Sequence, residues 1–265
     1  MSKSDLTAVI LCGGRGERLR PFTDTLPKTL VPLRGRPILE HIIRYLAAQD
    51  ITRFILCVGY RAEAIREFVR TFKETGWDIE CVDSGDATMT DRLLDARERL
   101  SGPMLMCYGD TLANVDVRQL RAEHEKNSAL ATMTVYPFYS PFGIVNVDSD
   151  DHITKFSEKP RLPYWINIGY MFSELCALDL VSRNSDMPEF LIALAASGSL
   201  HAFRHEGRHL TINTEKERAS AETQIVDFFT VLDHGERRST ANTKSEPTSA
   251  ETELIDLFAF NQEAF

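Results

Sequence analysis

Glycines and cations near the N-terminus form a stretch whose chemistry suits phosphate. Residues 11–33 read LCGGRGERLRPFTDTLPKTLVPL and begin at the end of the apolar run AVIL. Glycine has no Cβ, so backbone N–H groups can approach phosphate oxygens, while arginine and lysine neutralise phosphate charge. The residues concerned are Gly13, Gly14, Gly16, Arg15, Arg18, Arg20 and Lys28. The stretch predicts a loop that holds a polyphosphate at the end of a strand.

This loop differs from the two common phosphate-binding motifs. The chain has no G-x-x-x-x-G-K-[ST] sequence, and GGRGER lacks the G-x-G-x-x-G spacing of dinucleotide-binding loops. An oxidoreductase that binds a dinucleotide is therefore disfavoured. A glycine-rich turn with a steric role is the alternative interpretation. Such a turn needs only a positive φ and gains nothing from Arg15, Arg18 and Lys28.

A carboxylate stands at a second place where a strand is expected to end. Asp110 closes the run MLMCYGD. Magnesium takes hard oxygen ligands, usually one or two carboxylates together with phosphates and waters. An aspartate after a strand is also a common turn residue. From the residues alone, a metal ligand and a turn residue are both open interpretations of Asp110.

The pattern of apolar residues predicts the elements that position these groups. Buried strands are expected at TAVIL, FILCV, DIECV and MLMCYGD, and amphipathic helices at PILEHIIRYLAAQ, AEAIREFVRTFKE and RLLDARERL. This alternation predicts an open, mostly parallel sheet between helical layers. Ligands bind such sheets at the carboxyl ends of the strands, where the glycine-rich loop and Asp110 both fall. After residue 129 the pattern becomes richer in strands.

An ordered series of segments resembles the sugar-1-phosphate nucleotidylyltransferases, and within them the glucose-1-phosphate cytidylyltransferases. GGRGERLRPFT, PKTLVP and RPILEHII resemble the family's opening signature, and GWDIECVDSGDATMT and CYGDTLANVDV resemble its nucleotide-binding segments. PFGIV, FSEKP, WINIGYMF and SLHAFRHEGRHLTINTEKE follow in the family's order. The resemblance covers roughly residues 6–218. It implies a three-layer α/β/α Rossmann-like nucleotidyltransferase fold with a mostly parallel, mixed central sheet.

The resemblance also implies roles for individual residues. Arg18 is expected to hold the β- and γ-phosphates of a nucleoside triphosphate, and Lys28 to reach the phosphates around the reacting phosphorus. Two interpretations of Arg15 are left open, a contact with the nucleotide and a cation that faces solvent. The expected nucleotide-binding residues are Leu11, Gly13, Gly14, Arg15, Gly16, Thr88, Thr90 and Gly109.

Magnesium is the cofactor that the resemblance implies, with Asp110 as one ligand. The family's second ligand is a carboxylate in a P-M-D-T segment. Here the matching segment is HLTINTEKE, which places Asn213 at that position. An amide oxygen can bind Mg²⁺ but adds no charge, so weaker metal affinity is expected. We favour Asp110 and Asn213 as ligands. The alternatives are a shifted register that brings in Glu215, and weak activity.

The resemblance places the second substrate, a sugar 1-phosphate, on Gly143, Glu158, Lys159, Asn167 and Gly169. Glu158 is expected on sugar hydroxyls and Lys159 on the phosphate. Asn167 stands within an apolar strand, and a buried amide needs a hydrogen-bonding partner such as a sugar hydroxyl. Ile168 stands where the family usually has a small residue, which indicates a remodelled sugar pocket.

The function implied by the resemblance is synthesis of an NDP-sugar and pyrophosphate from an NTP and a sugar 1-phosphate. CTP is favoured because ATMT resembles the cytidylyltransferases. GTP, UTP and dTTP stay open, since Asp91 and Thr111 replace glycines near the expected base and ribose. The acceptor, the second substrate, is left open, and the candidates are hexose, heptose and cyclitol 1-phosphates. The alternatives are a cytidylyltransferase for phosphocholine or a phosphonate, and a non-catalytic protein that binds a nucleotide sugar.

Composition indicates a globular protein of the cytoplasm. A net charge of −9 disfavours a nucleic-acid partner. No apolar run reaches membrane-spanning length, and MSKSDLTAV lacks the apolar core of a signal peptide, so no membrane partner is expected. The five cysteines are odd in number and form no C-x-x-C, which favours buried thiols in a reducing compartment. A homo-oligomer is left open.

Residues 1–232 are expected to form the catalytic domain. Its NTP-binding half is expected over about 1–128, and its sugar-phosphate-binding half over about 129–232. A flexible linker at 233–250 and a C-terminal amphipathic helix at 251–265 are expected to follow. SAETQIVDFF, residues 220–229, recurs as SAETELIDLF, residues 249–258. The second copy is expected to pack on the body of the protein or a neighbouring subunit, or else to dock a partner.

Overall fold

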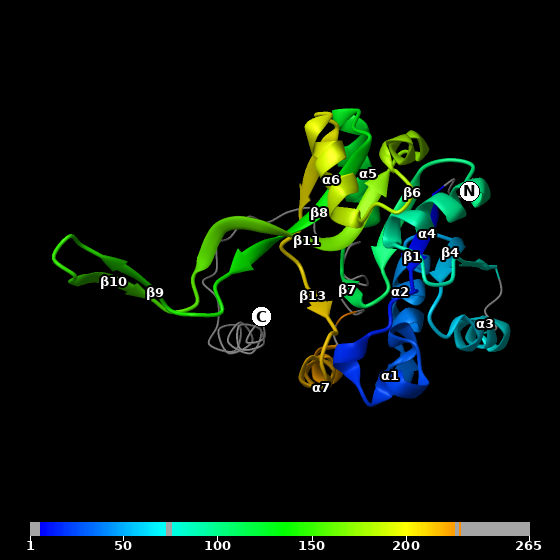
Figure 1. Cartoon of the computed structure of the whole chain (residues 1–265), viewed down its shortest axis with the longest axis horizontal. Coiled ribbons are helices and arrows are strands. Elements are labelled where there is room, and N and C mark those ends of the chain that lie inside the picture. The colour runs from blue at the N-terminus through cyan, green and yellow to red at the C-terminus, as the bar shows by residue number, and fades with distance from the viewer. Residues whose placement is uncertain (1–5, 73–75, 226–227, 229–265) are drawn as a thin grey trace, which may run out of the picture. The chain divides into compact units, whose positions relative to one another are not determined.

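A computed structural model describes residues 6–72, 76–225 and 228 (Figure 1). Residue contacts divide the chain into two compact units. The first contains residues up to 135 and again from 167, and the second contains residues 136–166. The division expected at about residue 129 stays a prediction, because compactness does not report which substrate each part binds. The expected linker and C-terminal helix lie outside the described residues.

Seven strands form the central sheet, in the order β12-β8-β11-β6-β1-β4-β5. Strands β6, β1, β4 and β5 are parallel, β12 is parallel to β8, and β11 is antiparallel to β6. The predicted mostly parallel, mixed sheet is therefore confirmed. The strands are β1 (Thr7–Leu11), β4 (Arg53–Val58), β5 (Asp78–Asp83), β6 (Met104–Tyr108), β8 (Ala131–Tyr139), β11 (Arg161–Ser173) and β12 (Leu200–Arg204).

The strand order reverses beside β1. The chain passes from β1 to β4 and β5 on one side, and then returns to place β6 on the other side. At such a reversal a crevice forms outside the carboxyl ends of the strands, and ligands of open α/β sheets bind there. The glycine-rich loop leaves β1 at this edge, and Asp110 follows β6. The topology therefore brings the two predicted groups to one place.

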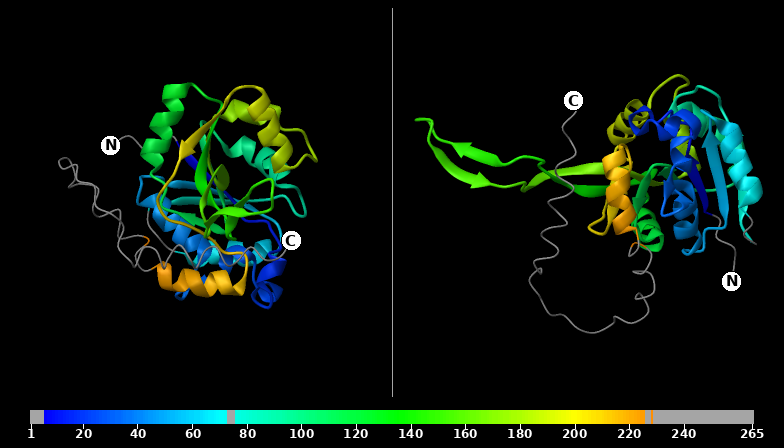
Figure 2. Two further views of the ribbon diagram at one scale, coloured as in Figure 1. Left: turned by 90° about the vertical axis from the view of Figure 1, so that its left-hand side faces the viewer. Right: turned by 90° about the horizontal axis from the view of Figure 1, so that it is seen from below.

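Helices lie on both faces of the sheet in the first unit (Figure 2). No helix among the described residues is both long and apolar enough to cross a membrane. The helices are α1 (Phe22–Thr25), α2 (Ile38–Ala47), α3 (Ala62–Thr71), α4 (Met89–Ala96), α5 (Val117–Asn127), α6 (Met187–Ala196) and α7 (Glu215–Gln224). The 3₁₀ helices are η1 (Glu17–Leu19), η2 (Lys28–Leu30), η3 (Arg97–Arg99) and η4 (Leu175–Leu180). Short strand pairs are β2 (Pro32–Leu33) with β3 (Arg36–Pro37), and β7 (Thr111–Ala113) with β13 (His209–Thr211).

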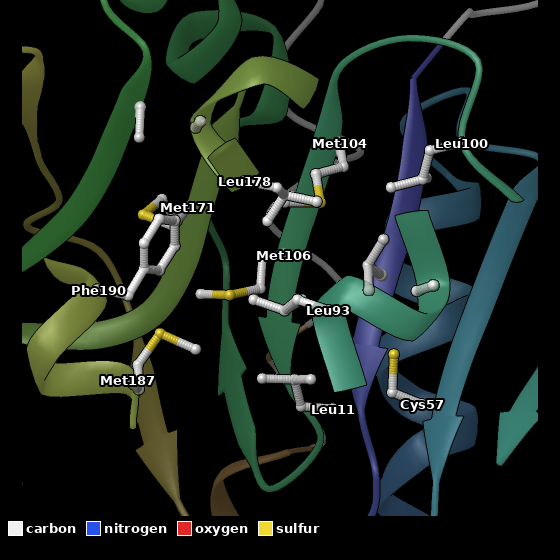
Figure 3. Packing of buried hydrophobic residues seen from close by; sticks show 14 of the residues in the cluster. Leu11, Cys57, Leu93, Leu100, Met104, Met106, Met171, Leu178, Met187 and Phe190 are labelled. Carbon is white, nitrogen blue, oxygen red and sulfur yellow. The ribbon is translucent and has the colours of Figure 1, made fainter. Parts of the chain in front are cut away.

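One core cluster packs α4 and α6 against the sheet. Leu93 of α4, Phe190 of α6 and Leu11 of β1 all belong to it (Figure 3). Ile10 is fully buried as well, but it faces the opposite layer, because successive side chains of a strand alternate. Burial on both faces explains why β1 has an apolar sequence without alternation.

The second unit contains a β-hairpin, which is green in Figure 1. Its strands are β9 (Ile144–Val147) and β10 (Ile153–Ser157), which pair antiparallel with a register shift between Ile153 and Lys155. At the tip, the Asp148 carboxylate accepts hydrogen bonds from the backbone N–H groups of Asp150 and His152. This side-chain turn fixes the connection between the two strands.

Candidate active site

The glycine-rich loop turns sharply after β1. Gly16 has φ 65° and ψ 36°, a left-handed conformation that glycine adopts without strain, and it precedes η1, which carries Arg18. The Thr23 hydroxyl donates a hydrogen bond to the Gly16 carbonyl at 2.9 Å. A Cβ atom on Gly16 would lie 2.8 Å from the Cβ of Lys28. The close approach of Gly16 to Lys28 brings the loop and the predicted cation together.

A buried arginine that the sequence analysis missed supports this loop. Arg92 of α4 is 4% exposed, and its guanidinium donates hydrogen bonds to the Val58 and Gly85 carbonyls. Cβ atoms on Gly13 and Gly59 would lie 2.2 and 2.4 Å from that guanidinium. No pattern marked Arg92, because an arginine in an amphipathic helix ordinarily faces solvent. The glycine at position 13 therefore leaves room for the arginine beneath the loop.

The contact with Arg92 gives a test of what constrains the loop. We expect Gly13→Ala to lower the free energy of unfolding by about 1–3 kcal/mol, because the added methyl group overpacks against a held guanidinium. Gly14→Ala is the matched control. A Cβ at Gly14 meets no atom within 4 Å, so a change within about 0.5 kcal/mol is expected. Urea denaturation measures both variants, and equal losses would show that Arg92 does not constrain the loop.

Four polar side chains meet at the carboxyl edge of the sheet. The Lys28 ammonium lies 2.6 Å from Asp110 Oδ2 and donates to Asn213 Oδ1 at 2.8 Å. Arg18 Nη2 donates to the same Asn213 oxygen at 3.1 Å. Lys28 is largely buried, with 12% of its side chain exposed, whereas 28% of the Asp110 side chain is exposed. The cluster thus combines two cations, one carboxylate and one amide oxygen, in which Lys28 contacts Asp110 and Asn213, and Arg18 contacts Asn213.

Two short strands explain how residues so distant in the chain meet. Strands β7 and β13 pair antiparallel, with Thr211 opposite Thr111. The backbone N–H of Ile212 donates to the Asp110 carbonyl at 3.1 Å. Asp110 is fixed further by the Thr111 hydroxyl, which donates to its Oδ1 at 3.1 Å. This pairing brings Asn213 next to the end of β6.

The oxygen atoms of this cluster fit a magnesium ion in kind and in number. Mg²⁺ prefers hard oxygens and commonly binds one or two protein ligands, with phosphates and waters completing its shell. Asp110 and Asn213 supply one such oxygen group each. The described residues contain no group of three or more His, Cys, Asp or Glu side chains suited to a metal. Glu215, the alternative ligand, instead forms an ion pair with Arg218, which favours Asn213.

Arg15 lies apart from this cluster. It forms an ion pair with Asp86 at 3.2 Å, and its guanidinium carbon is 5.9 Å from the centre of the Tyr60 ring. More than half of the Arg15 side chain is exposed, and exposed ion pairs hold side chains only weakly. Arg15 is therefore free to swing towards a ligand, and both interpretations of it stay open.

The N-terminus of α4 is held by the segment before α6. Thr88 caps α4 by accepting a hydrogen bond from the Asp91 N–H at 3.1 Å. The Thr90 hydroxyl is fully buried and donates to the Ser185 carbonyl at 2.5 Å, while Asp91 accepts from the Asn184 N–H at 3.0 Å. This geometry favours a structural role for the Thr90 side chain. The nucleotide-binding roles of Thr88 and Thr90 stay predictions.

The other predicted nucleotide contacts lie on or beside β1 and β6. The Gly109 N–H donates to the Leu11 carbonyl at 3.1 Å. A Cβ at Gly109 would lie 2.6 Å from the Thr29 methyl group and 2.8 Å from the Leu11 carbonyl oxygen. Gly109 is therefore required by close packing of the backbones, whether or not a nucleotide also contacts it.

The expected burial of Asn167 was wrong. Asn167 is exposed, and its Oδ1 accepts a hydrogen bond from the Gly169 N–H at 2.8 Å. Gly169 has φ 75°, and a Cβ there would lie 2.4 Å from the Tyr108 ring. The left-handed conformation of Gly169 within β11 breaks the alternation of side chains, so the apolar neighbours of Asn167 did not indicate its environment. Burial raises the pKa of Tyr108, and a hydrogen bond with Asn167 opposes that shift.

The remaining predicted acceptor residues belong to the second unit. A Cβ at Gly143 would lie 2.7 Å from two carbons of the Phe156 ring and 3.1 Å from Glu158 Oε2. Gly143 and Glu158 are therefore neighbours at the base of the hairpin. Lys159 follows with φ 40°. The sugar-phosphate roles of these three residues stay predictions.

Three histidines of the first unit are neutral at neutral pH. Because their pKa values are lowered, we expect the folded protein to lose stability in acid. Burial lowers the pKa of His209 from 6.5 to about 4, and burial also lowers the pKa values of His41 and His205. Between pH 6.5 and about 4 the unfolded chain binds a proton at His209 while the folded chain does not, and the lowered pKa values of His41 and His205 act in the same direction. The free energy of unfolding therefore falls as the pH falls through this window.

The histidine effect is measurable by urea denaturation at pH 7 and pH 4.5. We expect His209→Gln to reduce the loss of stability between these pH values by about 1–3 kcal/mol. His152→Gln, at an exposed histidine of the hairpin, is the control and should leave the loss unchanged. An identical pH dependence in His209→Gln and the wild type would exclude His209 as a source of acid sensitivity.

Comparisons with known proteins agree with this geometry. A family model described as "Nucleotidyl transferase" matches residues 7–197. A Bacillus subtilis (strain 168) protein named "Probable glucose-1-phosphate cytidylyltransferase" is 32% identical over 80% of this chain and 92% of its own length. The mannose-1-phosphate guanylyltransferase of Mycobacterium tuberculosis is 30% identical over 75% of this chain and 58% of its own. The structure of HddC from Yersinia pseudotuberculosis complexed with GMP-PN has a TM-score of 0.65 at 19% identity, covering 83% and 99% of the two chains, a likeness of fold.

Proposed function

The chain belongs to the nucleotidyl transferase family, and on that premise we propose that it is a sugar-1-phosphate nucleotidylyltransferase. In this reaction a phosphate oxygen of the sugar 1-phosphate attacks the α-phosphorus of an NTP. The new P–O bond forms as the bond to the β-phosphate oxygen breaks, and pyrophosphate leaves with the electron pair. The observation that carries the proposal is the position of Lys28, which lies against Asp110 and Asn213 at the edge where strand order reverses.

Charge is the main obstacle to this reaction, because two anions must meet and more charge develops on the leaving group. Catalysis of phosphoryl transfer is therefore mostly positioning and electrostatic stabilisation. We assign Lys28 to the oxygens around the α-phosphorus, and Arg18, which shares Asn213 with it, to the β- and γ-phosphates. Neither role needs a proton transfer.

Asp110 and Asn213 are the residues that would hold Mg²⁺. A bound Mg²⁺ neutralises phosphate charge and orients the phosphates. In the structure both side chains accept hydrogen bonds from the Lys28 ammonium. Lys28 thereby holds the two oxygen groups close together, and its positive charge offsets the negative charge of Asp110. Asp110 would have to exchange this ammonium for the metal, and the triphosphate would compete with Asp110 for the ammonium.

CTP and a sugar 1-phosphate are the substrates that we propose. The relative named as a cytidylyltransferase matches 80% of this chain at 32% identity, which supports CTP. The relative named as a guanylyltransferase matches at 30% identity, so GTP is the next candidate. Asp91, which stands where the family has glycines near the expected base and ribose, accepts a hydrogen bond from the Asn184 backbone N–H, which supports a remodelled base pocket. Phosphocholine and a phosphonate remain candidate acceptors.

Pyrophosphate release tests the proposal directly. The purified protein is incubated with Mg²⁺, each of the four ribonucleoside triphosphates or dTTP, and a panel of sugar 1-phosphates, phosphocholine and aminoethylphosphonate. Release that needs one NTP and one acceptor together would support the transferase and identify both substrates. Nucleotide binding without release across the panel would favour the non-catalytic binding protein.

A further inference from the structure

Helix α7 begins directly after Asn213, and its first turn holds the backbone of that residue. Thr214 caps the helix by accepting a hydrogen bond from the Glu217 N–H at 3.2 Å, and Glu217 Oε2 accepts one from the Thr214 N–H at 2.9 Å. This reciprocal pair is a capping box, which the T-x-x-E sequence favours. Glu217 Oε2 also accepts a hydrogen bond from the Asn213 N–H at 2.5 Å. Asn213 precedes the N-cap, so this last bond fixes the chain outside the helix.

The backbone at Asn213 is thereby held from two directions. The N–H of Ile212 donates to the Asp110 carbonyl at 3.1 Å, and the next N–H along the chain, that of Asn213, donates to Glu217. An amide oxygen carries no net charge, so its contribution to metal binding depends on how well it is placed. Functional groups must be held within about 0.5 Å of their working positions. The neutral ligand of this site therefore depends on its backbone anchor more than a charged carboxylate does.

The next residue of the same turn connects α7 to the segment that carries Lys28. Arg218 Nη1 donates to the Pro32 carbonyl at 3.3 Å, and the Arg218 guanidinium carbon lies 4.9 Å from the centre of the Phe22 ring. Phe22 precedes Lys28 in the chain and Pro32 follows it, and α7 lies beside α1 in Figure 1. Glu215 orients the largely buried guanidinium through hydrogen bonds of 2.7 and 2.8 Å. Arg218 therefore anchors α7 on both sides of Lys28.

We propose that Glu217 and Arg218 are positioning residues of the active site, and that the first turn of α7 sets the position of Asn213 relative to Lys28. Glu217 holds the backbone of Asn213, and Arg218 holds the segment of Lys28. Because the two residues are adjacent, this turn bridges the two sides of the 2.8 Å contact between Lys28 and Asn213. The inference rests on the proposed function, in which Asn213 is a ligand of the metal.

Binding of Mn²⁺ to the full-length protein, followed by electron paramagnetic resonance without substrates, tests the role of Glu217. We expect Glu217→Ala to weaken Mn²⁺ binding about tenfold, as is typical when a side chain that orients a metal ligand is lost. Glu217→Gln keeps an oxygen that accepts from both N–H groups and should bind Mn²⁺ within threefold of the wild type. Thr214→Ala is the matched control. It removes the cap of the same helix but leaves the bond between Glu217 and Asn213, so it should also stay within threefold.

A double-mutant cycle shows whether Glu217 acts through Asn213. In an Asn213→Ala background, Glu217→Ala should weaken Mn²⁺ binding less than twofold further, because the ligand that it positions is already absent. A tenfold further weakening in that background would overturn the proposal. So would equal weakening by Glu217→Gln, which would assign the effect to charge, or by Thr214→Ala, which would assign it to fraying of the helix. Unchanged affinity in Glu217→Ala would overturn it as well.

Arg218→Ala tests the anchor on the other side. We expect it to weaken Mn²⁺ binding at least threefold, because α7 then loses its hold on the segment of Lys28. Arg218→Lys keeps the charge but cannot form the paired hydrogen bonds with Glu215, so its affinity should lie between those of Arg218→Ala and the wild type. Arg34→Ala is the matched control, since Arg34 is exposed and donates to the Glu222 carbonyl of α7 at 3.5 Å. Equal affinities of Arg218→Ala and Arg34→Ala would overturn the role of Arg218.

These measurements are separable from the transferase reaction, because Mn²⁺ binding needs neither an NTP nor an acceptor. The expected Mn²⁺ results without pyrophosphate release would support the positioning residues and count against the transferase. Pyrophosphate release with unchanged Mn²⁺ affinity in the variants would support the transferase and overturn this inference. A wild-type protein that binds no Mn²⁺ would overturn it too.

Discussion

Lys28→Ala is expected to lower the turnover for pyrophosphate release by about 10²- to 10³-fold. Removing one preorganised electrostatic contact to developing charge typically has an effect of this size. Lys28 is the cation most deeply placed in the cluster, with 12% of its side chain exposed, and its ammonium lies within 2.6–2.8 Å of Asp110 and Asn213. Turnover at saturating NTP and acceptor is the quantity to measure.

A matched variant separates this effect from a general loss of charge. Arg20 is a cation of the same stretch, but it is exposed, and within the described part of the chain it pairs only with Asp24 across 3.3 Å. Arg20→Ala should therefore change turnover less than twofold, as expected for a surface ion pair. Circular dichroism and a thermal melt of Lys28→Ala check that the fold is kept. A well-folded Lys28→Ala variant with wild-type turnover would remove Lys28 from the mechanism.

The parts of the fold that the sequence predicted are short continuous apolar runs, which form buried strands, and helices with a clear apolar stripe. The expected strands at TAVIL, FILCV, DIECV and MLMCYGD correspond to β1, β4, β5 and β6. Helix α5 was missed because it buries only Val117, Leu120 and His124 of its eleven residues. Helix α6 was missed because MPEFLIALAA is apolar on most sides and shows little periodicity. Periodicity fails both for nearly exposed helices and for nearly uniform ones.

The candidate site, too, could be predicted only in part. Resemblance to a family placed Lys28, Asp110 and Asn213 in one site, and the structure brings them together. The exposure of Asn167 could not be predicted, because it depends on the left-handed conformation of Gly169 within β11. Arg92 could not be found either, since its function as a support depends on Val58, Gly85 and the loop meeting from three segments. Spacing along the chain indicates residue chemistry, whereas these features arise from packing between distant segments.

Asn213→Asp is expected to lower the Mg²⁺ concentration that gives half-maximal activity by about tenfold. A carboxylate adds charge to the ligand set, and metal affinity at oxygen sites rises with ligand charge. The expected shift corresponds to about 1.4 kcal/mol of binding free energy. The new carboxylate would also lie within hydrogen-bond reach of Lys28 and Arg18. These two cations oppose part of the gain, which limits the expected shift to one order of magnitude.

Binding of Mn²⁺, followed by electron paramagnetic resonance without substrates, measures the same change independently of turnover. Asn213→Asp should bind Mn²⁺ more tightly than the wild type, and Asn213→Ala, which removes the amide oxygen, should bind it more weakly. Opposite shifts in the two variants are expected only if position 213 is a ligand. A loss of packing alone would shift both in one direction. If Mn²⁺ affinity and Mg²⁺ dependence are unchanged in both, Asp110 must hold the metal without Asn213.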